Sequence, residues 1–219
     1  QAWQPEFFEE LRDLGVSSYR NNSIMNTPCG HIAPGHKKII DVGYGAIRQQ
    51  ALEWLEAHRG NLMGEDVEKY IFYVSAARTC EAGSILCRRY AESCLKKAES
   101  CTDPKRKSEL LTMADGLAWI AENPARNFWE ACQAAIMYQL LIMLECSPPA
   151  LAFGRFDQYT WPYLKRDLEN GTLTMDEAQE IVDAFFLKSQ CFYKGGTGMG
   201  TTSAGLGNTY QHTTIGGVD

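Results

Sequence analysis

The sequence has no apolar run long enough to cross a bilayer and no excess of basic residues. Its longest apolar stretch, ACQAAIMYQLLIMLEC at 131–146, is interrupted by Gln133 and Gln139 and falls short of the about 18 residues that a transmembrane helix needs. The formal net charge is −6, from 21 lysines and arginines against 27 aspartates and glutamates. Nucleic acids and anionic membrane surfaces attract basic faces, so this balance argues against both kinds of partner.

The chain also lacks any C-x-x-C pair, although it carries eight cysteines. Four of them, Cys80, Cys87, Cys94 and Cys101, follow one another at intervals of seven residues, which is typical of one face of a helix. Neighbours two turns apart lie about 10 Å from each other, too far for a disulfide. These cysteines therefore predict a stripe of small apolar side chains in a reduced core, and hence a cytoplasmic protein.

Most of the chain has the periodicity of amphipathic or buried helices. Within this pattern Gly43 and Gly45 weaken one helix locally, and a bend is expected near Gly83 in the next. The end of the chain is rich in Gly and Thr, and NTYQHTTIGG predicts an extended strand over 208–217. Helices are expected over residues 5–20, 36–58, 65–101, 103–122, 127–146, 160–171 and 175–192.

Two of these helices carry a capping signal at their start. Asn127 is followed three residues later by Glu130, and Thr174 by Glu177. In a capping box the first side chain accepts the backbone N–H of the second residue, and the second side chain reaches back to the first backbone N–H. The chain begins without Met and stops directly after its Gly- and Thr-rich segment, so we expect a helical piece of a longer protein that ends where a sheet begins.

The stretch MNTPCGHIAPGH, residues 25–36, gathers three side chains that can carry chemistry: Cys29, His31 and His36. They could bind zinc, but the spacing C-x-H-x4-H matches no common zinc pattern. Cys29 could be a nucleophile with His31 as its base, but no third orienting group is evident. A structural turn and the wall of a ligand pocket are the remaining interpretations.

The glycine-rich stretch GGTGMGTTSAG at 195–205 does not match a phosphate-binding loop. Such a loop needs a lysine after its glycines, whereas Lys194 precedes them and strand-like sequence follows. These glycines instead favour a close approach of the backbone to a ligand or to another segment of the chain.

Several blocks taken together resemble one family. GHIAPGHKKIIDVGYGAI, CRRYAESCLKKAESCTDPKRKSELLTMAD, NPARNFWEACQA, GRFDQYTWPYLKRDLENGTLTMDEAQEIVDAFFLK and TIGGVD, in this order, are similar to the glycyl radical enzymes. The branch is the one related to pyruvate formate-lyase, which includes polyol dehydratases, choline lyase and hydroxyproline dehydratase. The block that begins GRFDQY is the most specific of the five.

The resemblance implies a ten-stranded α/β barrel wrapped by helices, built from chains several times longer than this one. Residues 1–219 would be part of a pyruvate formate-lyase-type domain, with a mostly α region over 1–190 and the first barrel strand or strands over 191–219. The cysteine that abstracts hydrogen and the glycine that carries the radical are expected beyond Asp219. No catalytic residue and no metal ligand are therefore expected within this chain.

What the resemblance assigns to this chain is one side of a substrate pocket. His31 matches the family histidine that lines the site, whereas His36 has no counterpart and is expected to be structural. Arg155 and Asp157 are expected to form a buried structural pair. Pro149 stands where dehydratases carry a polar side chain that bonds the departing hydroxyl, and proline offers no such donor, which argues against assisted loss of a hydroxyl. The substrate-binding residues are then His31, Pro149, Ala150, Ala204 and Tyr210.

The predicted function is that of an oxygen-sensitive radical lyase or dehydratase, formate C-acetyltransferase-like in type, that cleaves a carbon bond of a small organic substrate after hydrogen abstraction. The resemblance implies a glycyl radical, installed by an activating enzyme that uses S-adenosylmethionine and an iron–sulfur cluster, with no cofactor bound in this chain, and a homodimer. Two alternatives stay open: radical addition of a hydrocarbon to an unsaturated acid, which also suits an apolar pocket, and a non-catalytic helical binding module.

Overall fold

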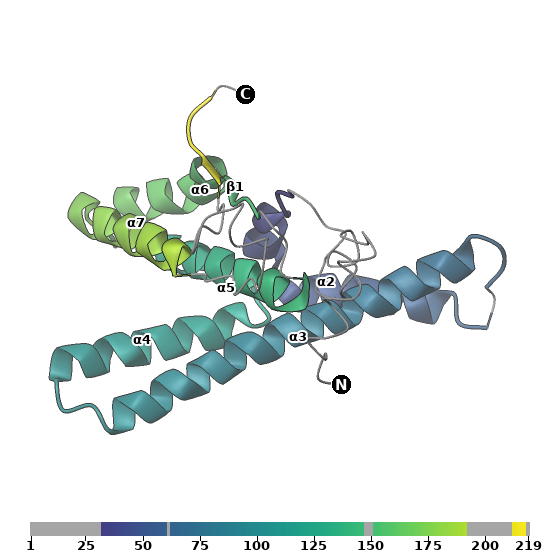
Figure 1. The fold of residues 1–219 in the computed structure, drawn as a ribbon, viewed down its shortest axis with the longest axis horizontal. Helices are drawn as coiled ribbons and strands as arrows, with labels where there is room; N and C mark the ends of the chain where they lie inside the picture. The colour runs from purple at the N-terminus through teal and green to yellow at the C-terminus, as the bar shows by residue number, and fades with distance from the viewer. Residues whose placement is uncertain (1–31, 61, 147–150, 192–211, 218–219) are drawn as a thin grey trace, which may run out of the picture.

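The computed structural model describes residues 32–60, 62–146, 151–191 and 212–217, and they are mostly helical (Figure 1). The helices agree with the predicted ranges within a few residues, except that α6 begins four residues earlier than expected. The helix predicted over 5–20 lies outside the described residues. The elements are α2 (His36–Ala57), α3 (Asp66–Glu99), α4 (Pro104–Ile120), α5 (Phe128–Cys146), β1 (Gly154–Arg155), α6 (Phe156–Glu169), α7 (Met175–Gln190) and β2 (Thr213–Thr214).

Helix α5 lies at the centre of this arrangement. The long helix α3 packs along α2 and along α4, and α5 contacts all three of them as well as α6 and α7. Its apolar residues are buried on most sides, from Phe128 at its start to Leu141. This confirms the expectation drawn from its uniformly apolar sequence.

The cysteine stripe on α3 is part of the core. Cys80, Cys87 and Cys94 are buried free thiols, and burial raises the pKa of Cys87 to about 12. Cys101 is half-buried and follows the end of α3, so the expectation that it extends the stripe on the same helix is wrong. Burial also raises the pKa of Cys80, and because thiolates rather than thiols react, Cys80 and Cys87 are inert packing groups.

Glycines let neighbouring segments approach closely at two places in the fold. Gly43 interrupts α2 with φ 79° and ψ 161°, and the N–H of Gly45 donates to the carbonyl oxygen of Glu122 at 2.8 Å. The bend expected near Gly83 does not interrupt α3, which is one continuous helix there. A Cβ at Gly83 would instead lie 2.5 Å from Cε1 of Tyr44, so this glycine provides room for a ring of α2.

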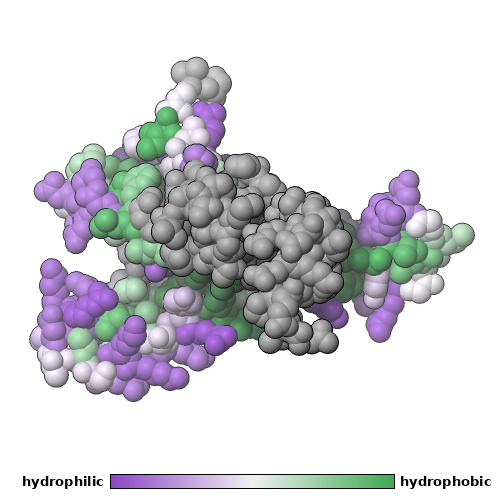
Figure 2. Space-filling model, in the orientation of Figure 1, coloured by the Kyte–Doolittle hydropathy of each residue, from purple (hydrophilic) through white to green (hydrophobic). Residues whose placement is uncertain are grey.

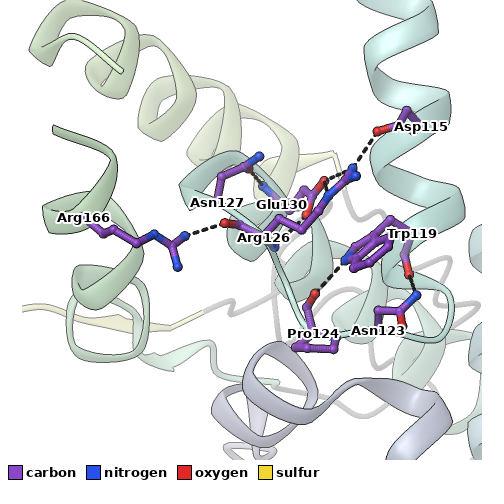
Figure 3. Close-up of polar contacts among 8 residues, drawn as sticks. All are labelled: Asp115, Trp119, Asn123, Pro124, Arg126, Asn127, Glu130 and Arg166. Carbon is purple, nitrogen blue, oxygen red and sulfur yellow. Dashed lines mark hydrogen bonds and ion pairs between the residues drawn. The ribbon is translucent and has the colours of Figure 1, made fainter. Parts of the chain in front are cut away.

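The start of α5 is fixed by polar groups from three segments (Figure 3). Asn127 Oδ1 accepts the N–H of Glu130 at 2.9 Å, as predicted. The other half of the predicted box is wrong by one residue: the Glu130 carboxylate accepts the N–H of Arg126 at 2.7 Å and Nε of Arg126 at 2.8 Å. The guanidinium of Arg126 attracts this carboxylate, which is almost fully buried. The second predicted box, between Thr174 and Glu177, is complete.

The two strands form a small parallel sheet. Gly154 pairs with Thr213 and Arg155 with Thr214. β1 lies between the helices predicted over 127–146 and 160–171, where no strand was predicted. One further parallel bridge joins Ile32 to Leu151. Within the described residues the extended structure is therefore two strands and one bridge, and the predicted strand over 208–217 is observed at Thr213–Thr214.

Apolar side chains are exposed where α2 and α3 meet at the projecting end of the molecule (Figure 2). Among the described residues, no helix combines the length and apolar character needed to cross a membrane. The exposed apolar residues of this end are Leu52, Met63, Val67, Tyr70, Ile71 and Phe72.

Candidate functional site

The five predicted substrate-binding residues, His31, Pro149, Ala150, Ala204 and Tyr210, all lie outside the described residues. Three stretches that flank them are described. Ile32 follows His31, Leu151 follows Ala150, and His212 comes two residues after Tyr210. The location of the site can therefore be inferred from the backbone of these neighbouring residues.

The three flanking stretches lie side by side. The N–H of Ala152 donates to the carbonyl oxygen of Ile32 at 2.9 Å, and the N–H of Phe153 donates to that of His212 at 2.7 Å. Both pairings are parallel, so the chain enters all three stretches from the same edge. Segments far apart in the sequence thus converge at one place in the fold.

His36 is the first residue of α2 and lies close to the place where these three stretches meet. Its ring is almost fully buried, between the rings of Tyr138, Phe153 and Tyr159, whose centroids lie 5.3, 5.5 and 5.9 Å away. Nδ1 lies 3.1 Å from the carbonyl oxygen of Pro34 and Nε2 lies 3.0 Å from Oε1 of Gln139. Both ring nitrogens therefore face oxygen atoms of the protein, which confirms a structural role and argues against zinc binding by His36.

Burial lowers the pKa of His36 to about 4, and hydrogen bonds to Pro34 and Gln139 oppose this only in part. The unfolded chain takes up the proton near pH 6.5, before the folded protein does. Folding stability should therefore fall by about 2 kcal/mol between pH 7 and pH 5 on account of this residue. Urea denaturation at both pH values measures the loss, and His36→Phe should remove this share of it. An equal pH dependence in that variant would contradict the assignment.

Gln139 is the functional candidate that sequence reasoning missed. It is fully buried in α5, and its side-chain Nε2 donates to the carbonyl oxygen of Leu151 at 2.9 Å. In the sequence it counted only as an interruption of an apolar run. An uncharged polar residue within an otherwise apolar buried helix was the signal, because such a group needs a partner.

Arg155 and Asp157 do not form the buried pair that was expected. Arg155 is exposed, and both side chains contact the backbone of Gly216, two residues after the end of β2. The carboxylate of Asp157 accepts the N–H of Gly216 at 2.7 Å, and Arg155 donates to its carbonyl oxygen at 3.4 Å. The GRFDQ and TIGG motifs are therefore joined by hydrogen bonds at the parallel sheet.

The model of the family described as pyruvate formate lyase-like matches residues 1–219. The chain belongs to this family. Among its relatives, the isethionate sulfite-lyase of Nitratidesulfovibrio vulgaris is 35% identical over 153 residues, which cover 69% of this chain and 18% of that protein. The (2S)-3-sulfopropanediol dehydratase of Klebsiella oxytoca is 30% identical over 213 residues, which cover 94% of this chain and 25% of that protein.

The pyruvate formate lyase-like fold is also found among solved structures. A glycyl radical enzyme from Archaeoglobus fulgidus superposes with a TM-score of 0.82 at 25% identity, over 97% of this chain and 28% of that chain. This chain thus spans between 18% and 28% of the length of these three proteins.

Proposed function

We propose that the protein containing this chain is a glycyl radical lyase or dehydratase, which cleaves a carbon bond of a small organic substrate after hydrogen abstraction. The two relatives named above are, by their names, a lyase and a dehydratase. The radical cysteine and glycine belong, in this proposal, to sequence beyond Asp219. This chain contributes helices and the first strands of a ten-stranded barrel.

The observation that carries the proposal is the convergence of three stretches at one edge. Ile32, Leu151 and His212 are the described neighbours of three predicted substrate-binding positions, and hydrogen bonds of 2.9 and 2.7 Å join their stretches. Parallel strands place the residues before them at a common edge. We therefore propose that His31, Pro149, Ala150 and Tyr210 share one pocket, to which the family resemblance also assigns Ala204.

In this pocket His31 and Tyr210 would orient the substrate, and Pro149 with Ala150 would form an apolar wall that excludes water. Proline has no side-chain donor for a departing hydroxyl, so a simple diol should be a poor substrate. The proposed partners are the small-molecule substrate, an activating enzyme that uses S-adenosylmethionine and an iron–sulfur cluster, and a second copy in a homodimer, in the cytoplasm.

The test uses the full-length protein, produced without oxygen together with its activating enzyme. Electron paramagnetic resonance should detect a glycyl radical. The activated protein is then given isethionate, 1,2-propanediol and phenylacetate separately. We expect it to convert isethionate or phenylacetate, and to convert the diol slowest because of Pro149. The variant His31→Ala should keep its radical but lose at least about 100-fold in kcat/KM, the scale of a lost substrate-orienting group.

His58→Ala is the matched control, since this histidine lies just after the far end of α2 and should leave turnover unchanged. Absence of the radical signal in the activated full-length protein would refute the proposal. Fast conversion of 1,2-propanediol would refute only the role given to Pro149.

A further inference from the structure

A buried pair of side chains connects two of the stretches that flank the proposed pocket. His36 Nε2 lies 3.0 Å from Gln139 Oε1, and Gln139 Nε2 donates to the carbonyl oxygen of Leu151 at 2.9 Å. His36, Gln139 and Leu151 are each almost fully buried. We call these two hydrogen bonds the His36–Gln139 link.

The link joins segments that are distant in the sequence. His36 opens α2, directly after the loop that contains Ile32, and its Nδ1 and backbone N–H both lie near the carbonyl oxygen of Pro34 in that loop, at 3.1 and 2.8 Å. Gln139 belongs to α5, the most buried helix. Leu151 opens the stretch that leads into β1. The loop before α2 and the stretch before β1 are thus attached to the same core helix.

The direction of the hydrogen bonds follows from the amide of Gln139. Because its nitrogen donates to Leu151, its oxygen faces His36, and Nε2 of His36 must carry the hydrogen that joins them. A neutral imidazole, which burial favours, carries only this one hydrogen, so Nδ1 has a lone pair and contacts the carbonyl oxygen of Pro34 without donating to it. Tyr159 adds a further contact, since its ring stacks on His36 and its hydroxyl donates to the carbonyl oxygen of Phe153 at 3.1 Å.

We propose that His36 and Gln139 are positioning residues of the substrate pocket, which hold the loop before α2 against the stretch before β1. The inference rests on the proposed function, because the pocket is the one assigned there. Neither side chain needs to touch the substrate. Their effect follows because groups that are no longer held in place bind the substrate less tightly, and because a buried polar group that loses its partner destabilises the arrangement.

The experiment compares His36→Phe and Gln139→Met in the full-length protein. Phenylalanine keeps the ring among its aromatic neighbours, and methionine keeps the length of glutamine, but neither makes the link. Hydrogen exchange of the Ala152 and Phe153 amides, which donate to Ile32 and His212, should become roughly tenfold faster, the scale of one lost buried hydrogen bond. His58→Phe and Gln133→Met are the matched controls and should leave the exchange of these amides unchanged.

Kinetics of the activated protein give the second measurement. For the compound that the unaltered protein converts, both variants should raise KM roughly tenfold or more with a smaller change in kcat, at unchanged radical yield. His36→Gln, which can still donate to Gln139, should restore most of the loss. Unchanged exchange and KM in both link variants, or equal changes in the controls, would overturn the proposal. A full-length protein that shows no glycyl radical after activation would refute the proposed function, and the exchange rates would then still decide whether the link positions these stretches.

Discussion

Replacing Gly43 by alanine should prevent the protein from folding stably, with a loss of at least about 4 kcal/mol. Its backbone has φ 79° and ψ 161°, a conformation that is essentially restricted to glycine. A Cβ there would lie 2.5 Å from the carbonyl carbon of Asn123 and 2.6 Å from the carbonyl oxygen of Glu122. Both clashing atoms belong to the backbone and cannot rotate away.

The matched control is Gly60→Ala. Gly60 has nearly the same φ, 78°, but a Cβ there would meet no heavy atom within 4 Å. It should therefore lose only about 1 kcal/mol, the cost of the backbone conformation. Thermal unfolding of both variants therefore compares a positive φ alone, at Gly60, with a positive φ that is combined at Gly43 with ψ 161° and close backbone contacts. Equal losses at the two positions would show that the contact with Glu122 and Asn123 matters little.

Replacing Arg126 by methionine should destabilise the protein by about 4 kcal/mol, because it leaves the buried carboxylate of Glu130 without its cation. Glu130 is 1% exposed, and Nε of Arg126 donates to it at 2.8 Å. Arg126 also pairs with Asp115 at 2.6 Å and lies 4.7 Å from the centre of the Trp119 ring (Figure 3). Chemical denaturation measures the loss.

Two further variants test the cause of that loss. Adding Glu130→Gln to Arg126→Met removes the unpaired charge, so the double variant should be more stable than Arg126→Met alone. Arg106→Met breaks an ion pair with Glu109 on the surface and should have no measurable effect. If the double variant were less stable than the single one, the buried charge would not be the cause.

The helices were predictable because their signals are local. Periodicity and the Thr174–Glu177 cap predicted a helix over 175–192, and α7 spans Met175–Gln190. The apolar run of α5 correctly indicated a buried helix. The partners of side chains that reach across the fold could not be predicted in this way. The sequence cannot show that Asp167 accepts the N–H of Phe128 at 2.6 Å, or that the carboxylate of Glu130 turns toward Arg126.

The pocket was less accessible to sequence reasoning than the helices. The five residues assigned to it come from a resemblance, and they lie outside the described residues. The sequence did mark the flanking motifs, but it could not show that Asp157 and Arg155 meet Gly216 rather than each other. Such contacts depend on the parallel register of β1 and β2, which is set by tertiary structure.

The long sequence separation within the parallel sheet determines when each part of the molecule can fold during synthesis. Helices α3 and α4 follow one another in the sequence and pack against each other. This hairpin can therefore form while the ribosome is still translating α5. Among the described residues the strand partner of β1 is β2, which cannot pair until Thr213 has emerged, and α6 and α7 are complete by then. The edge of β1 is therefore open to pairing with other chains throughout that interval, and pauses in translation between residues 155 and 213 should increase aggregation.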